Sequence, residues 1–200
     1  MRSIRSRHLA TLALVALLAV GCSSTPTPST YYLLRGELDE RTVRVTAVPR
    51  VGLGNLVVAS YLLSSEGIML ETGDGRIQPA ATHLWAETLD LGLRWYLRGE
   101  ISRELDEPIG VGIVNPIPWQ YTIDVIVSRL HATMEGTALI EARFAIVPRG
   151  APGELRVTDF ARTIPRARGG YGGVVEAEKA LLAELAKLVA DEVRTVLNPE

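Results

Sequence analysis

The chain has 200 residues, of which 47% are hydrophobic and one is a cysteine, and its formal net charge is −2. This length is enough for one ordinary domain with a real hydrophobic core. A single cysteine excludes a disulfide framework, and the lack of a basic excess argues against a nucleic-acid partner.

The first 21 residues have the pattern of a bacterial export signal. Arg2, Arg5 and Arg7 give a positively charged start, and Leu9 to Val20 form an uncharged apolar run. This run is shorter than the about 20 apolar residues that a membrane-spanning helix needs. We therefore predict that residues 1–21 form a cleaved lipoprotein signal peptide.

Cys22 ends the run Leu-Ala-Val-Gly-Cys, where a lipoprotein signal peptidase cuts. We predict that its sulfur carries a covalent lipid, the only cofactor-like group expected. Each buried acyl methylene contributes about 0.8 kcal/mol, so such an anchor is effectively permanent. Two alternatives are an incidental cysteine after a secretory signal and a buried core thiol. Ser23, in place of aspartate, favours the outer membrane of a Gram-negative cell over the inner one.

Without the signal peptide, 18 basic residues face 23 acidic ones, a net charge of about −5. No second long apolar run follows, so we expect a soluble domain that hangs from its lipid. Residues 22–30 are rich in serine, threonine and proline and predict an extended tether. Residues 31–200 are the predicted domain.

Mixed α and β patterns follow the tether. Alternation over Val43–Val48 predicts a strand. Asp74-Gly75 between the apolar runs 68–72 and 76–78 predicts a hairpin. Helical spacing from Leu84 to Leu105 predicts a helix that ends before Pro108.

The second half predicts a meander and a long helix. We expect antiparallel strands at Tyr121–Leu130, Ala138–Val147 and Leu155–Ile164. The glycine-rich segment 169–173 is predicted to be a flexible lead-in to a helix over Val174–Leu197, which packs one face on the sheet. The expected fold class is α+β (mixed α/β): a single domain, with a mostly antiparallel sheet of about five to six strands and two main helices packed on it.

The residues offer little for catalysis. His83 and His131 are the histidines left after signal removal, and neither a His-x-x-x-His nor a cysteine pair exists, so a metal site is not expected. Phosphate-loop and nucleophile-elbow motifs are absent, and the Gly-x-Gly pairs at Gly52 and Gly110 are interpreted as ordinary turns. We predict that the protein is not an enzyme. A hydrolase would require His83 or His131 beside a serine or a pair of carboxylates in one cleft.

Four residues are candidates for a partner contact: His83, Trp85, Glu87 and Trp119. On a helix, His83 and Glu87 would lie one above the other and form a patch with Trp85. Alternatively Trp85 belongs to the core, His83 hydrogen-bonds near the helix start and Glu87 favours the positive helix end. Trp119 is either a strand-entry anchor or a binding residue.

The order of several segments resembles a known family. The cysteine is followed by Tyr31-Tyr32-Leu33-Leu34, then by Val-Gly-Leu-Gly at 51–54, Tyr61-Leu62, His-Leu-Trp-Ala-Glu-Thr-Leu at 83–89 and Pro118-Trp119. This order is similar to that of the ABC-type transport auxiliary lipoproteins, the paraquat-inducible protein C family. The likeness spans essentially the whole domain after the cysteine, and its sharpest element is the segment at 83–89.

The resemblance implies a periplasmic, non-enzymatic role. Such lipoproteins work with MCE-domain proteins and inner-membrane components that move lipids or other hydrophobic compounds between the two membranes. The lipoprotein supplies the outer-membrane end, and a homo-oligomer is compatible with that position. The alternative is a stand-alone envelope lipoprotein that binds a small hydrophobic or glycan ligand, for which a deep apolar pocket lined by Trp95 or Trp119 is expected.

Overall fold

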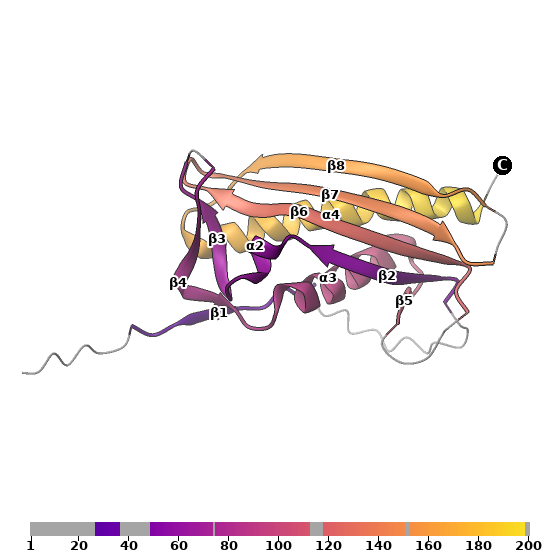
Figure 1. Ribbon diagram of the computed structural model, residues 1–200, viewed down its shortest axis with the longest axis horizontal. Helices are drawn as coiled ribbons and strands as arrows, with labels where there is room; N and C mark the ends of the chain where they lie inside the picture. The colour runs from indigo at the N-terminus through magenta and orange to yellow at the C-terminus, as the bar shows by residue number, and fades with distance from the viewer. Residues whose placement is uncertain (1–26, 37–48, 74, 113–117, 151–152, 199–200) are drawn as a thin grey trace, which may run out of the picture.

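One mixed sheet and the helices packed on it make up the domain in the computed structural model (Figure 1). The structure describes residues 27–36, 49–73, 75–112, 118–150 and 153–198. The strands are β1 (Thr30–Tyr32), β2 (Val51–Val58), β3 (Gly67–Glu71), β4 (Ile77–Trp85), β5 (Gly110–Val111), β6 (Tyr121–Thr133), β7 (Thr137–Pro148) and β8 (Arg156–Pro165). The helices are α2 (Ser60–Leu63), α3 (Leu89–Leu105) and α4 (Gly170–Leu197).

The predicted α+β class is confirmed, with a larger and more mixed sheet than expected. Among the described residues the sheet has eight strands instead of five or six, in the order β1-β4-β3-β6-β2-β5, with β7 and β8 extending from β6. The hairpin β3–β4 and the meander β6–β7–β8 are antiparallel, as predicted. However, β1–β4, β2–β5, β2–β6 and β3–β6 pair in parallel. The predicted strand Val43–Val48 lies outside the described residues.

Strict alternation explains the long antiparallel strands. Along β7, Ala138, Ile140, Phe144 and Ile146 are buried, while Arg143 between them is exposed. Because side chains of a strand alternate between its two faces, one face of β7 faces the core and the other faces outward.

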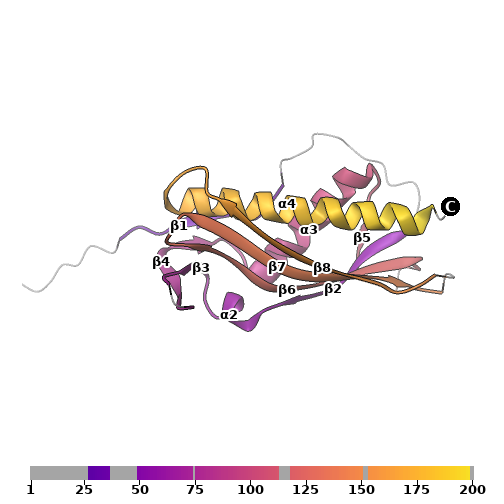
Figure 2. The same ribbon diagram turned by 90° about the horizontal axis from the view of Figure 1, so that it is seen from above.

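α4 lies along the core face of the meander β6–β7–β8 (Figure 2). Its buried residues include Leu181, Leu182, Leu185, Val189 and Val193, at steps of three and four. Burying each such side chain fully stabilises the fold by roughly 1.5–3 kcal/mol. The predicted flexible lead-in is wrong from Gly170 onward, because the helix begins there. Gly173 passes so close to the Arg168 carbonyl that a Cβ would overlap it, so the turn into α4 requires glycine at this position.

The helix predicted from Leu84 begins later. His83, Leu84 and Trp85 form the end of β4, held by pairing with β1, and α3 begins at Leu89 after Thr88. α3 ends at Leu105 because Asp106 adopts a left-handed conformation with φ of 55°, two residues before Pro108. The expected stacking of His83 and Glu87 on one helix face is therefore wrong.

α2 bridges a gap in the sheet. β2 leaves β6 after Val58, and β3 joins β6 only at Leu70. Between these points Ala59 donates its N–H to the Val127 carbonyl, and buried Leu62 packs into the core. This gap brings α2 side chains next to β6, where they take part in the hydrogen bonds described below.

Candidate functional site

His83 lies between two tyrosines instead of at an open surface. Its ring stacks on Tyr171 of α4, with centroids 4.4 Å apart, and its Nδ1 is 3.1 Å from the Tyr32 hydroxyl of β1. His83 is half-buried and joins β1, β4 and the first turn of α4. The histidine therefore fastens the N-terminal strand to the domain, and its contact with a partner stays a prediction.

Trp85 and Glu87, which come shortly after His83 in the sequence, lie in different environments. Trp85 is buried, with 6% of its surface exposed, so its indole belongs to the core. Glu87 forms a bidentate ion pair with Arg35, in which Arg35 Nη2 lies 2.7 Å from Glu87 Oε2. The carboxylate therefore fixes the segment after β1 to the segment before α3.

Trp119 lies across the start of β2 and β5. A Cβ on Gly52 or Gly110 would overlap the Trp119 ring, so both glycines leave room for the indole. The two Gly-x-Gly pairs are therefore not turns at these positions: Gly52 and Gly54 lie in β2, and Gly110 lies in β5. The buried Trp119 Nε1 has no hydrogen-bond partner among the described residues.

A histidine network that sequence reasoning did not assemble lies beside α2. His131 Nδ1 is 3.0 Å from the Tyr61 hydroxyl, and His131 Nε2 is 2.9 Å from Glu71 Oε2. The Leu130 N–H donates to the same tyrosine oxygen at 3.4 Å. Arg129 contacts the Glu71 carboxylate at 3.5 Å. The Tyr61-Leu62 pair was a visible signal, but His131 lies 70 residues from Tyr61 and 60 residues from Glu71, and only the fold brings them together.

This network resembles a catalytic relay in its order of groups, but its burial argues for a structural role. His131 is 2% exposed, so no substrate reaches its ring without local opening. Burial lowers the pKa of His131, while its hydrogen bond to Glu71 acts in the opposite direction. A neutral ring can donate from Nε2 to Glu71 and accept the Tyr61 proton at Nδ1, which satisfies both nitrogens.

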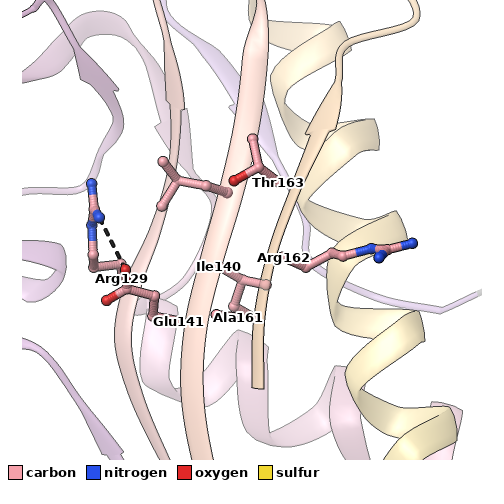
Figure 3. Close-up of a pocket in the computed structure, with 7 residues that line it drawn as sticks. Arg129, Ile140, Glu141, Ala161, Arg162 and Thr163 are labelled. Atoms are coloured by element: carbon pink, nitrogen blue, oxygen red, sulfur yellow. Dashed lines mark hydrogen bonds and ion pairs between the residues drawn. The ribbon is translucent and has the colours of Figure 1, made fainter. Parts of the chain in front are cut away.

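Two shallow depressions lie on the outer surface of the meander β6–β7–β8. One is lined by Arg129, Glu141, Arg162 and Thr163 on β6, β7 and β8 (Figure 3). Its arginines are already paired, Arg129 with Glu141 and Arg162 with Glu184. The other is lined mainly by Ile126, Arg143 and Phe160 and their neighbours. Neither depression contains Trp95 or Trp119, the residues expected in a ligand pocket.

Within the described residues, the structure provides neither a metal site nor a membrane-spanning helix. No cluster of three or more histidine, cysteine, aspartate or glutamate side chains there could hold a metal ion. In the same part of the chain, no helix is both long and apolar enough to cross a bilayer.

Comparison with known proteins shows to which family the chain belongs. The family described as "ABC-type transport auxiliary lipoprotein component" matches residues 32–190. The chain belongs to this family. The match begins at Tyr32, the last residue of β1, and includes most of α4, so it covers nearly the whole described fold.

Individual relatives agree with the auxiliary lipoprotein assignment. The chain is 22% identical over 189 residues to the intermembrane transport lipoprotein PqiC of Escherichia coli, covering 92% of this chain and 96% of that protein. The PqiC of Shigella flexneri matches equally well. The fold is similar to the crystal structure of an uncharacterized protein, with a TM-score of 0.68, 21% identity and coverage of 84% and 99%. A Xanthomonas campestris protein has a TM-score of 0.57 at 19% identity, with coverage of 83% and 96%.

Proposed function

We propose that this auxiliary lipoprotein is held by a lipid on Cys22 at the periplasmic face of the outer membrane, as a non-enzymatic part of an MCE-type transport system. The observation that carries the proposal is the family match over residues 32–190 behind a lipoprotein-type signal. The name of the Escherichia coli relative, an intermembrane transport lipoprotein, supports the same direction. The cargo would be a lipid or another hydrophobic compound.

A supporting role fits the chemistry of the domain. The buried His131 has both ring nitrogens engaged, and the arginines of the depression in Figure 3 are paired, Arg129 with Glu141 and Arg162 with Glu184 of α4. Groups poised for catalysis would instead need access to substrate and perturbed pKa values in a cleft. We therefore assign the domain a binding and positioning role.

Membrane attachment supplies the physical mechanism. A domain fixed to one membrane meets its partner at a high effective concentration, so that even a weak contact holds the end of a conduit in place. The partners expected by family resemblance are an MCE-domain periplasmic protein and, through it, inner-membrane components.

The lipid anchor is tested at Cys22. Mass spectrometry of the mature protein should find acylation at this residue, and Cys22→Ala should remain folded yet leave the outer-membrane fraction. Ser23→Asp is the matched variant, because it keeps the sulfur and should move the acylated protein to the inner membrane. An unmodified wild-type protein, or continued outer-membrane fractionation of Cys22→Ala, would refute the anchor.

The transport role is tested by isolation from native membranes. Tagged protein extracted in mild detergent should recover an MCE-domain protein, and Cys22→Ala, which would be misplaced, should recover much less. Repeated failure to recover such a protein from the acylated wild type would contradict the transport role while leaving the anchor intact.

A further inference from the structure

One end of the molecule gathers the N-terminal strand and three loops. The chain enters through β1 at the end opposite to the C-terminus (Figure 1). There the stacking of His83 on Tyr171 brings β1 and β4 to the start of α4, and the Arg166 N–H donates to the Gly136 carbonyl at 2.8 Å. We define the anchor end as Tyr31 of β1 and Leu33 just after β1, together with the loop residues 72–73, 75–76, 133–136 and 166–169.

The length of the tether restricts where this end can be. Thr30 lies eight residue steps after Cys22, and each extended step spans at most about 3.6 Å, so Thr30 at the anchor end stays within about 29 Å of the lipid. By contrast, the 28 residues of α4 extend about 42 Å toward the other end of the domain. The anchor end is therefore the part of the domain that the tether keeps nearest the bilayer.

A rigid apolar tip projects from this end. Met134, at the β6–β7 turn, is 61% exposed. The turn around it is well ordered by hydrogen bonds: the Met134 N–H donates to the Glu71 carbonyl at 2.9 Å, and the hydroxyls of Thr133 and Thr137 lie 2.9 Å apart. Since its backbone groups are already satisfied, the turn can present the methionine side chain without refolding.

β1 and the residue after it add two more exposed apolar side chains beside the tether. Tyr31 is 61% exposed and Leu33 is 49% exposed, while Tyr32 between them faces His83. Tyrosine is enriched at membrane–water interfaces because its ring is apolar and its hydroxyl is polar. Together with Met134, these side chains give the anchor end an apolar character that no described residue covers.

We propose that the anchor end lies directly on the bilayer surface, with Met134, Tyr31 and Leu33 in the headgroup region. This inference rests on the acylation of Cys22 in the proposed function. The occupant of the anchor end is thus the lipid bilayer itself, and the opposite end of the domain points away from it.

The test uses a unique thiol. Because Cys22 is the one cysteine of the chain and its sulfur is acylated, Met134→Cys provides a single labelling site for an environment-sensitive fluorophore. Leu155→Cys is the matched control, because Leu155 is apolar, equally exposed at 61% and adjacent to the start of β8 at the opposite end. Both acylated proteins are placed in vesicles of phosphatidylethanolamine and phosphatidylglycerol that contain a spin-labelled lipid as quencher.

We expect several-fold stronger quenching and a blue-shifted emission for the label at position 134 relative to position 155. A label at Tyr31→Cys should behave like the one at position 134. Equal quenching at the two ends, or stronger quenching at position 155, would overturn the inference. An unquenched label at position 134 that is protected in native envelopes would assign the anchor end to a protein partner instead.

The same samples separate this inference from the proposed function. Intact-mass measurement reports acylation before reconstitution. An unmodified Cys22 would overturn both, because the tether argument is lost, whereas acylated protein with an unquenched label at position 134 would overturn only the placement of the anchor end.

Discussion

Glu178 is a carboxylic acid on the buried face of α4. It is 2% exposed, and burial raises its pKa to about 8, so the side chain is mostly neutral at pH 7. No ion pair or hydrogen bond to another described residue offsets that burial. A single residue thus makes the stability of the whole domain depend on pH.

The sign of this dependence follows from the raised pKa. Below about pH 4.5 the carboxyl is protonated in both the folded and the unfolded chain. Between pH 4.5 and 8 the unfolded chain ionises while the folded chain does not, so the free energy of unfolding falls as the pH rises. We expect Glu178→Gln to remove a loss of roughly 2–5 kcal/mol across this interval, as measured by urea unfolding at several pH values.

Glu176→Gln is the control for Glu178, because Glu176 is exposed on the same helix and pairs with Arg168. Its pH profile should stay close to that of the wild type, since exposed pairs contribute little. Parallel profiles for the wild type and Glu178→Gln would contradict the buried-acid interpretation.

Gly52 makes a second prediction at the level of one residue. A Cβ at this position would overlap the Trp119 ring, so Gly52→Ala should lower the free energy of unfolding by about 1–3 kcal/mol. Gly99 is the matched site, because no atom lies within 4 Å of a Cβ there, in the interior of α3. Gly99→Ala should stabilise the protein by about 0.5–1 kcal/mol. Equal effects in urea titrations would disprove the role assigned to Trp119.

Among the elements, α2 is short but holds the gap between β2 and β3. Its Tyr61 hydroxyl bonds both His131 and the Leu130 N–H, which β2 and β3 leave unpaired in this stretch of β6. Burial also raises the pKa of Tyr61, so the hydroxyl keeps its proton. The tyrosine therefore takes the place of a missing strand contact.

A double-mutant cycle measures this contact. His131→Leu and Tyr61→Phe should each lower the free energy of unfolding by about 1–3 kcal/mol, because each leaves a buried polar partner unsatisfied. The double variant should lose less than the sum of the two, with a coupling of about 1 kcal/mol. Additive losses would show that the 3.0 Å contact contributes nothing of its own.

His131 also has a pH effect opposite to that of Glu178. Because burial lowers its pKa below the usual 6.5, the stability it contributes is present above pH 6.5 and is lost as the pH falls. The two variants, His131→Leu and Glu178→Gln, therefore separate two effects that partly cancel in the wild type.

Local signals predicted the elements well where neighbours in sequence are also neighbours in space. Asp74-Gly75 marked the β3–β4 hairpin, and alternation marked β6, β7 and β8. The apolar spacing around Leu84 and Trp85 fits a helix as well as a strand. Pairing with β1, more than 50 residues earlier, decides for the strand, and no local pattern reveals that pairing.

The candidate site was harder to predict than the fold. Parallel pairings such as β2–β6 join distant segments, and these bring Tyr61, Glu71 and His131 together. The sequence drew attention to His83, Trp85 and Glu87 as neighbours on one surface. In the structure His83 stacks on Tyr171, Trp85 lies in the core and Glu87 pairs with Arg35, because the chain leaves β4 before α3 begins.

At the scale of the whole molecule, one continuous core joins all layers. The buried cluster includes residues of β2, β6 and β7 as well as α3 and α4. We expect a single cooperative unfolding transition, with tryptophan fluorescence and far-ultraviolet circular dichroism giving the same urea midpoint. Trp85 lies shortly before α3 and Trp95 lies within it. A fluorescence change at lower urea than the change in circular dichroism would therefore reveal that α3 unfolds separately.

The pairing of β1 with β4 has a mechanical consequence. The two strands run in the same direction, and Thr30, Tyr31 and Tyr32 pair with His83, Leu84 and Trp85. A pull transmitted through the polypeptide upstream of Thr30 acts along the strand axis. It therefore loads these bonds, together with the stacked ring of His83, in shear and at the same time, instead of opening them one after another. A short strand arranged in this way resists detachment under a pull from its N-terminal side.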